Sequence, residues 1–387
     1  MATPASLPED IIINILLKLS LKSIAQFKCV AKPWYEMVKN PKFIKMHRQR
    51  DVRNYKFSVL LESSKTNSYY DKDGCHYTID FDVTSSTYHM AVQTYLPRNM
   101  FVLDSQLIDS CGLIGLSTRN PDRDILGMIC LWNPSTQEYL NVPTPTSIRG
   151  KSKTLSQYGV CYDWKIHDYK LFLIVTKRYD EIFPEVWVSR LGSNIWKRIG
   201  NVPYDHSHVP DKNIYGIVHW IKHTKVIVSY DIVEERTRDE FQIPSCYLDD
   251  EWYSFYRMDV GFLGEDLYLS VNIIWYDCNI DLWVMKDYGV IDSWTKIFSI
   301  SKTSTNFRSL RPLHYLNKDC DILLHGNVKY SYEDVLVSCD PKNGRLKTFD
   351  IPCKPKHFYP TTFVGSLVSF KSAEFVEATK TISKVDI

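Results

Sequence analysis

Residues 7–43 read LPEDIIINILLKLSLKSIAQFKCVAKPWYEMVKNPKF, and this stretch decides how the N-terminal part of the chain folds. Pro8 favours an extended conformation for the residue before it, so a helix most naturally begins at Pro8. Glu9 and Asp10 then fall in the first turn, where negative charge is stabilising. Apolar residues recur at helical spacing as far as Leu19, which predicts a broad apolar face.

Two more short helices are predicted to follow. Ser20 can cap the second, which carries Ile24, Phe27 and Val30, and Pro33 can open the third. Three short helices over about 40 residues bury too little surface to be stable alone. Their surplus apolar side chains are therefore expected to pack either on a larger domain of the same chain or on a partner protein.

The order of residues in this stretch resembles the F-box. The matching positions are Leu7-Pro8-Glu9, Ile15-Leu16, Leu19, Leu21 to Ile24, Val30, Lys32, Trp34 and Phe43. Ser20 stands where the family usually has proline, and Pro33 follows Lys32 where a small polar or basic residue is common, but neither change removes an apolar anchor. The resemblance implies that the helices dock on a Skp-type adaptor. The residues expected to bind the adaptor are Leu7, Pro8, Ile15, Leu16, Leu19 and Trp34.

The composition is that of a folded globular protein with room for one large and one small domain in 387 residues. Apolar residues make up 44% and charged residues 24%, while 25 tyrosines and 10 tryptophans favour a β-rich body. The net charge is +2, yet residues 1–50 hold nine Lys and Arg against three acidic residues, so the remainder carries −4. The N-terminal lysines alternate with apolar positions, which favours a solvated helix face over a nucleic-acid surface.

Neither secretion nor a membrane span is expected. Residues 1–9 have no apolar core, and no run approaches the roughly 18 apolar residues that a spanning helix needs. The ten cysteines are far apart in sequence and form no C-x-x-C pair. Reduced thiols in the cytoplasm or nucleus are therefore expected.

A repeating strand pattern begins after a polar joint at residues 51–54 and continues to about Phe370. Five times, a β-branched or aromatic strand leads through a turn into a second strand; the first strands include Leu131, Val186, Val228, Leu282 and Val337. In three copies an Asn or Asp opens the turn, where its side chain can accept a hydrogen bond from the backbone ahead. Asn133 and Asp340 are 207 residues apart over four steps, so the period is about 52 residues.

Glycine-containing strands lie between these units, around Gly112, Gly159, Gly216 and Gly261. Two hairpins per period make a four-stranded blade, which predicts a β-propeller whose ring closure removes exposed strand edges. The pattern leaves the number of blades open, and a pair of stacked antiparallel sheets is the alternative. Residues 371–387 lose the strand pattern and are expected to form a flexible tail.

The β-rich region resembles the plant F-box-associated domain, a kelch-like repeat region. The most specific segments are DLWVMKDYGV at residues 281–290, SWTK at residues 293–296, and residues 216–220. Over nearly its full length the chain is most similar to the S-locus F-box and S-locus F-box-like proteins. The predicted fold is mainly β with a small N-terminal α-helical domain: an F-box over 1–50, then a kelch-like propeller over 51–370.

Sequence motifs do not indicate catalysis. G-x-S-x-G, a phosphate-binding glycine loop and H-E-x-x-H are all absent from the sequence. His206 and His208 could be half of a metal site, but their Pro-flanked polar surroundings favour a loop. The chain is therefore expected to be no enzyme and to bind neither metal nor cofactor.

The two resemblances imply a substrate-recognition subunit of a Skp–cullin–F-box ubiquitin ligase, which meets the cullin only through the adaptor. The S-locus resemblance further implies an S-RNase, a basic secreted protein, as the target. The candidate target contact is Asp249, Asp250 and Glu251 with Trp252 and Tyr253, since acidic and aromatic side chains suit a basic partner. A solvated loop is the alternative for this segment, and a stand-alone propeller binding module with an unrelated helical cap is the alternative for the whole chain.

Overall fold

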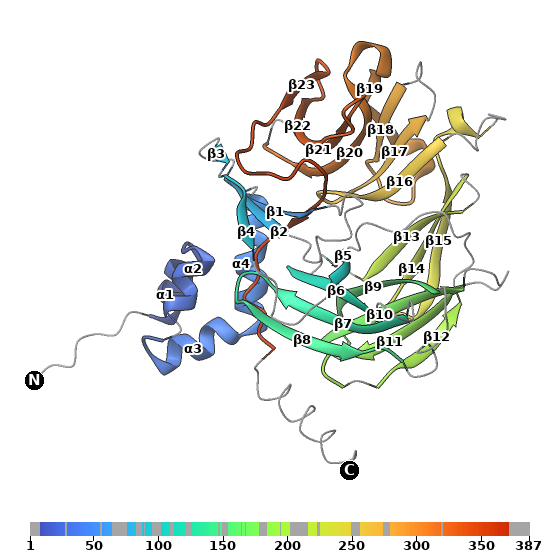
Figure 1. Ribbon diagram of the computed structural model, residues 1–387. Coiled ribbons are helices and arrows are strands. Elements are labelled where there is room, and N and C mark those ends of the chain that lie inside the picture. Colours follow the sequence, from blue (N-terminus) through green and yellow to red (C-terminus); the bar gives the residue numbers. More distant parts are fainter. Residues whose placement is uncertain are drawn as a thin grey trace, which may run out of the picture.

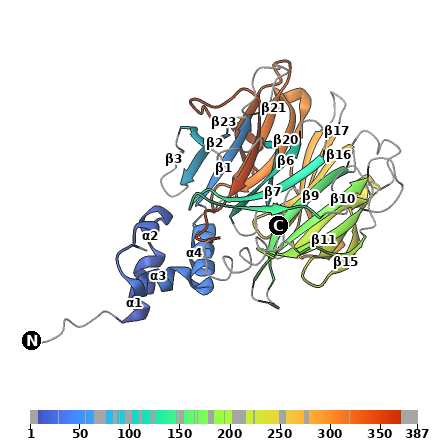
Figure 2. The same ribbon diagram turned by 60° about the horizontal axis from the view of Figure 1, so that its bottom comes forward.

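The computed structural model describes residues 8–27, 29–54, 56–63, 76–82, 87–88, 90–94, 102–108, 112–120, 125–145, 148, 154–163, 165–166, 168–177, 184–193, 195–201, 216–222, 225–248, 256–273, 279–318 and 320–370. Within them, four short helices precede six antiparallel sheets arranged as the blades of a propeller (Figure 1). The helices stand to one side of the ring, as the turned view in Figure 2 also shows.

The helices are α1 (Glu9–Leu17), α2 (Leu21–Phe27), α3 (Lys32–Lys39) and α4 (Pro41–Arg53). Pro8 is the residue before α1 rather than its first residue. Ser20 caps α2 as predicted, because its Oγ accepts a hydrogen bond from the backbone N–H of Ser23 at 3.2 Å. The third helix begins at Lys32, with Pro33 in its first turn.

The expectation of three helices followed by a polar joint at residues 51–54 is wrong, because α4 continues to Arg53. This helix is mostly polar, and long-range contacts hold it in place. His47 Nε2 lies 2.9 Å from the carbonyl oxygen of Leu19, and Arg50 Nη1 donates to the carbonyl oxygen of Leu17 at 2.5 Å. The carbonyl of Leu17, the last residue of α1, thereby gains the partner that helix ends lack, and so does that of Leu19 just beyond it.

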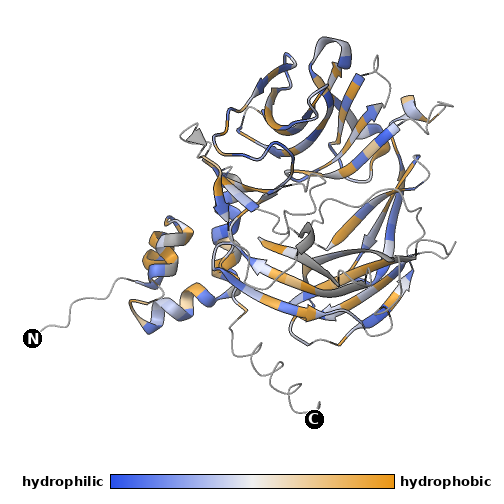
Figure 3. Ribbon diagram, viewed as in Figure 1, coloured by the Kyte–Doolittle hydropathy of each residue, from blue (hydrophilic) through white to orange (hydrophobic). Residues whose placement is uncertain are grey.

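Five sheets are built from strands that follow one another along the chain. They are β5 (Val102–Ile108), β6 (Leu113–Asn120), β7 (Ile125–Asn133) and β8 (Glu138–Pro143); β9 (Thr154–Asp163), β10 (Asp168–Lys177), β11 (Glu185–Arg190) and β12 (Lys197–Asn201); β13 (Ile217–Lys222), β14 (Val226–Asp231) and β15 (Arg236–Gln242); β16 (Tyr256–Leu263), β17 (Asp266–Ile273), β18 (Asn279–Met285) and β19 (Trp294–Ser301); and β20 (Phe307–Tyr315), β21 (Ile322–Val328), β22 (Asp334–Asp340) and β23 (Arg345–Thr348). Short 3-10 turns are η2 (Ser245–Tyr247), η4 (Ile291–Ser293) and η5 (Lys302–Ser304). Apolar residues fill the spaces between neighbouring sheets, and orange positions alternate along many strands in Figure 3.

The five strand–turn–strand units predicted from the sequence are the last two described strands of these five sheets. Asn133, Asp231 and Asp340 each open the turn between them. The Oδ1 atom of each accepts the backbone N–H two residues ahead at 2.9 Å. The predicted role of these side chains is confirmed.

The sixth sheet closes the ring by combining both ends of the propeller. It contains β24 (Phe358–Phe363), β1 (Lys56–Ser63), β2 (His76–Asp82), β3 (Thr87–Tyr88) and β4 (Val92–Thr94). Strand β24 pairs antiparallel with β1, with Phe363 opposite Ser58 and Phe358 opposite Ser63. The propeller is thereby confirmed with six blades, and the alternative of two stacked sheets is wrong.

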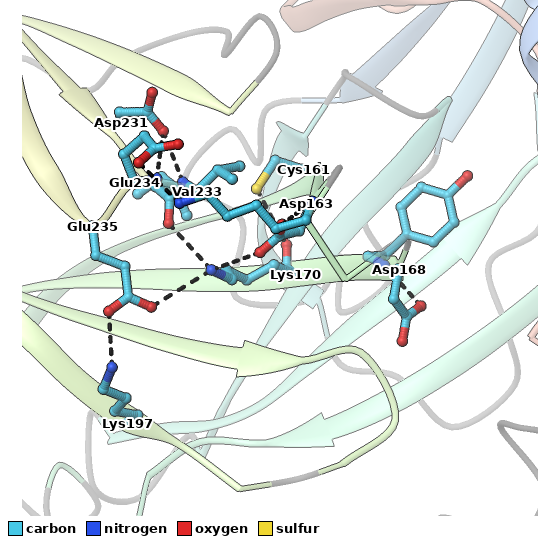
Figure 4. Close-up of polar contacts among 12 residues, drawn as sticks. Cys161, Asp163, Asp168, Lys170, Lys197, Asp231, Val233, Glu234 and Glu235 are labelled. Carbon is cyan, nitrogen blue, oxygen red and sulfur yellow. Dashed lines mark hydrogen bonds and ion pairs between the residues drawn. The ribbon is translucent and has the colours of Figure 1, made fainter.

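A buried lysine, Lys170, connects two neighbouring blades (Figure 4). Lys170 Nζ on β10 lies 2.9 Å from Asp163 Oδ2 on β9, and 3.6 Å from Glu235 Oε1 in the turn after β14. It also donates to the carbonyl oxygen of Ile232 at 3.4 Å. Burial alone would lower the pKa of Lys170, but the hydrogen bond and the charge of Asp163 outweigh it and raise that pKa. The pair with Asp163 is therefore charged and lies within one blade, while Glu235 and the carbonyl oxygen of Ile232 connect Lys170 to the next blade.

Replacing Lys170 with Ala is expected to lower the free energy of unfolding by about 3 kcal/mol, since Asp163 would remain buried without its cation. Lys197 provides the matched control: it also pairs with Glu235, at 2.8 Å, but its side chain is 68% exposed. Lys197→Ala should cost less than about 1 kcal/mol. Urea unfolding followed by circular dichroism measures both. Equal losses for the two variants would contradict a special role for the buried pair.

Candidate functional site

The helical domain has its own small core. Leu16, Ile24, Val38 and Phe43 are buried together, and the fifth member of the cluster is Leu367, which lies beyond the last strand. Leu16 is only 1% exposed and supports this core, and its contact with an adaptor stays a prediction.

The outward side of α1 carries a second set of apolar residues. Pro8 is exposed, Ile11 is 45% exposed and Ile15 is 48% exposed. Their spacing of three and four residues places them on one face of the helix. We call Pro8, Ile11 and Ile15 the docking stripe. Apolar side chains on the solvent face of a helix this short are typical of a surface that a partner covers.

The other residues expected to bind the adaptor are placed differently. Leu19 and Trp34 are partly buried against the helical core, and Leu7 lies outside the described residues. Ile11 was absent from the expected set, although its position midway between Pro8 and Ile15 on the same helical face could have indicated it.

Residues 364–370 form a C-terminal strap between the helices and the sheet β5–β8. In Figure 1 this red segment passes beside α4. Asn133 Nδ2 donates to the carbonyl oxygens of Ser366 at 3.1 Å and Val368 at 2.7 Å. The backbone N–H of Phe370 donates to Glu138 Oε2 at 2.8 Å. These bonds fix the strap on the propeller.

The strap also touches the helices directly. Leu367 packs in the helical core, whereas Val368 and Phe370 pack in the apolar core around β6–β10. A Cβ atom added at Gly365 would lie 2.2 Å from Leu21 Cδ1 on α2, so a larger residue there would force the Leu21 side chain to move. The strap therefore ties the docking stripe and the propeller into one unit.

The acidic segment expected to bind a target, Asp249, Asp250, Glu251, Trp252 and Tyr253, lies outside the described residues. The residues before it are firmly anchored. Tyr247 donates to Asp281 Oδ2, and Trp283 Nε1 donates to the Tyr247 hydroxyl at 3.2 Å. Burial, together with the hydrogen bond to Asp281, raises the pKa of Tyr247, so this hydroxyl stays protonated.

Opposite ends of β1 and β24 define two faces of the propeller. The helices are connected to the start of β1 at Lys56. The strap follows the end of β24 at Phe363, which lies opposite Ser58, so both connections are at the same end of this strand pair. The other end, where Ser63 pairs with Phe358, is about 20 Å away. Strands β16 and β24 each come first in the strand order of their sheets, and first strands run in the same direction in every blade of a propeller. Tyr256, where β16 starts, therefore lies on the same face as Phe358, where β24 starts, and this face points away from the helices.

No group of three His, Cys, Asp or Glu side chains suited to a metal ion is found among the described residues. His206 and His208 lie outside them. Burial lowers the pKa of His219 to about 3, and its Nε2 lies 2.7 Å from the hydroxyl of Tyr288, which is the setting of a neutral core histidine. In the part of the chain that is described, no helix has the length and apolar character to cross a membrane.

Comparison with known proteins identifies both parts of the chain. A family described as the F-box associated beta propeller domain matches residues 52–364, and the F-box domain matches residues 5–46. The chain belongs to the F-box proteins that carry an F-box associated β-propeller. The two matches meet between residues 46 and 52, inside α4 of this F-box protein.

Relatives of this F-box protein occur in Arabidopsis thaliana. F-box protein CPR1 is 28% identical over 94% of this chain and 89% of its own length. F-box/kelch-repeat protein At3g23880 is 25% identical over 91% of this chain and 97% of its own. Among solved structures, a putative 6-phosphogluconolactonase from Bacteroides uniformis aligns with a TM-score of 0.43 and 10% identity, over 79% of this chain and 99% of that chain.

Proposed function

We propose that this F-box protein is the substrate-recognition subunit of a Skp–cullin–F-box ubiquitin ligase. The observation that carries the proposal is the placement of two surfaces at opposite ends of β1 and β24. The docking stripe belongs to the helices at one end, and propeller loops lie at the other. A Skp-type adaptor would cover the stripe and connect it to the cullin, while a target protein would bind the loops.

Such a subunit makes and breaks no bond itself. It raises the effective concentration of the target near the ubiquitin-conjugating enzyme, and a rigid connection preserves that gain. The strap supplies the rigidity, because it packs in the helical core through Leu367 and bonds to the propeller through Asn133. We therefore propose a non-catalytic role that needs neither metal nor cofactor.

Co-expression with a Skp-type adaptor tests the proposal most directly. A substrate-recognition subunit should co-purify with the adaptor as a stable complex, and addition of the cullin and a conjugating enzyme should allow ubiquitin transfer to a bound target. A stand-alone propeller module with an unrelated helical cap would leave the adaptor unbound. Failure to form the complex, with the chain folded, would reject the ligase assignment.

For the target, we propose a basic protein bound by the acidic segment 249–253, with an S-RNase as the named candidate. The S-locus resemblance and the −4 charge of residues 51–387 support this choice. Charge at the rim of an interface mainly steers association and is screened by salt over about 8 Å.

Reversing Asp249 and Asp250 to Lys should slow association with an S-RNase at low salt about tenfold and flatten its salt dependence. Surface plasmon resonance at several ionic strengths measures this. The matched control reverses Asp287 and Asp292, two exposed acids of the connection between β18 and β19, and should leave the rate nearly unchanged. Equal rates for both double variants would place the target elsewhere.

The cytoplasm or nucleus is the proposed location. Cys130, Cys161 and Cys339 are buried free thiols, as expected for a protein that folds under reducing conditions. Burial raises the pKa of Cys130 and of Cys339 to about 12, so neither is a reactive thiolate.

A further inference from the structure

The hairpin between β21 and β22 displays two tyrosines that packing does not explain. Tyr330 is 87% exposed and Tyr332 is 54% exposed. Their φ angles are 64° and 56°, in the left-handed region that bulky side chains rarely adopt. Strained backbone of this kind is concentrated at functional positions. We call residues 328–334 the tyrosine hairpin.

The hairpin is held firmly in this conformation. The backbone N–H of Tyr332 donates to the carbonyl oxygen of Val328 at 3.0 Å, and Asn327 Nδ2 donates to the carbonyl oxygen of Tyr332 at 2.9 Å. Lys329 Nζ donates to the carbonyl oxygen of Thr305 at 3.1 Å, which secures the base of the hairpin against the preceding sheet connection. Aromatic side chains on a fixed backbone lose little entropy when a partner binds.

Basic side chains lie beside the tyrosine hairpin. The guanidinium carbon of Arg308 lies 5.4 Å from the centre of the Tyr332 ring. The Lys356 side chain is 80% exposed, and its Nζ lies 3.5 Å from Oε1 of Glu333 in the hairpin. His357 Nδ1 lies 3.1 Å from the carbonyl oxygen of Tyr332, and two residues further on Tyr359 is again exposed. Residues 302–357 contain ten Lys and Arg against six Asp and Glu, a net charge of +4, in contrast to the −4 of residues 51–387 as a whole.

The position of the hairpin suits recognition of a target. His357, which contacts Tyr332, directly precedes β24, whose first residue is Phe358. This end of β24 is the one away from the helices, so the hairpin lies on the face opposite the docking stripe. A target held there would not compete with the adaptor for space. In the described part of the chain, the hydroxyls of Tyr330 and Tyr359 have no hydrogen-bond partner and can serve a ligand.

We propose that the tyrosine hairpin, with Arg308, Lys356 and Tyr359, binds an extended acidic segment of the recruited protein. This inference rests on the proposed role in target recognition and assigns it a second contact, opposite in charge to segment 249–253. The tyrosines supply rigid anchors, and Arg308 selects carboxylates. Lys356 adds to this selection by exchanging its exposed, weak pairing with Glu333 for a carboxylate of the ligand. Arg308 and Lys356 are too few for a nucleic-acid backbone, which is bound by many cations together.

A random peptide library displayed on phage, selected against the full chain bound to its adaptor, tests the inference. Enriched peptides should be rich in Asp and Glu and should bind the Tyr330→Asn/Tyr332→Asn variant at least about tenfold more weakly. Asn tolerates the left-handed backbone, so this variant should unfold at the same temperature as the parent or higher. The control Tyr139→Ser removes an exposed tyrosine of β8 and should bind the peptides unchanged.

The charge requirement is tested separately. Arg308→Glu/Lys356→Glu should lose the acidic peptides, and a selection against it should enrich basic ones. Peptides that are not acidic, or that bind the double Asn variant as tightly as the parent, would overturn the inference. So would tighter binding of a single-stranded DNA oligonucleotide that depends on the same residues. Adaptor binding is recorded in every assay, so loss of peptide binding alone rejects this inference and leaves the proposed function standing.

Discussion

A chain shortened to end at His357 is expected not to fold, whereas a chain that ends at Phe370 should fold as the full-length protein does. The shorter chain lacks β24 and the C-terminal strap, and β1 becomes an open strand edge. It also loses six buried apolar side chains: Phe358, Phe363, Val364, Leu367, Val368 and Phe370. At roughly 1.5–3 kcal/mol each, their burial is comparable to the roughly 5–15 kcal/mol that stabilises a whole domain.

Soluble yield, far-UV circular dichroism and thermal unfolding distinguish the two chains. A third chain that ends at Phe363 separates closure from the strap. It keeps the pairing of β24 with β1 but loses Leu367 from the helical core, so hydrogen exchange should accelerate in the helices more than in the strands. A folded monomer from the chain ending at His357, or from residues 51–250 alone, would contradict ring closure as the source of stability.

The second large effect concerns the docking stripe. Replacing Ile11 and Ile15 together with Glu should weaken capture by a Skp-type adaptor at least 100-fold, since central apolar anchors are typically worth 2 kcal/mol or more each. Both side chains are about half exposed and Glu is a good helix former, so thermal stability should change little. Quantitative pull-down and calorimetry measure capture and stability in parallel.

Two controls show whether the stripe itself is responsible. Met46→Glu changes an equally exposed apolar residue of α4 and should leave capture intact. Leu16→Ala removes a core side chain and should lower the free energy of unfolding by about 2–5 kcal/mol. Leu7→Ala/Pro8→Ala should weaken capture to a smaller extent. Undiminished capture by the double Glu variant would reject adaptor binding through α1.

Much of the propeller was predictable because each repeat carries its own local signal. Asn133, Asp231 and Asp340 form their turns through hydrogen bonds to the backbone only two residues ahead. Such local contacts depend on neighbouring residues alone, so the sequence was enough to predict these turns. The sixth blade escapes such reasoning, because its first strand is β24 and its second is β1, from opposite ends of the propeller. A period along the chain cannot reveal a sheet assembled in that way.

The helical region was less predictable for a related reason. The length of α4 depends on His47 and Arg50 reaching the carbonyls of Leu19 and Leu17, which lie about thirty residues earlier. The burial of Leu16 depends on packing that includes Leu367. The sequence showed an apolar helix with more apolar residues than one face can hold, but only the tertiary contacts decide which of them face solvent.

Leu367 also determines when the core of the N-terminal helices can be completed during protein synthesis. The ribosome makes the helices first, yet Phe43 and Leu367 of the same core are separated by more than 300 residues. At a synthesis rate of about 5–20 residues per second, Leu367 is added on the order of tens of seconds after Phe43. A nascent or prematurely terminated chain therefore exposes its helices with an unfinished core, and only a chain translated through the last blade presents them complete.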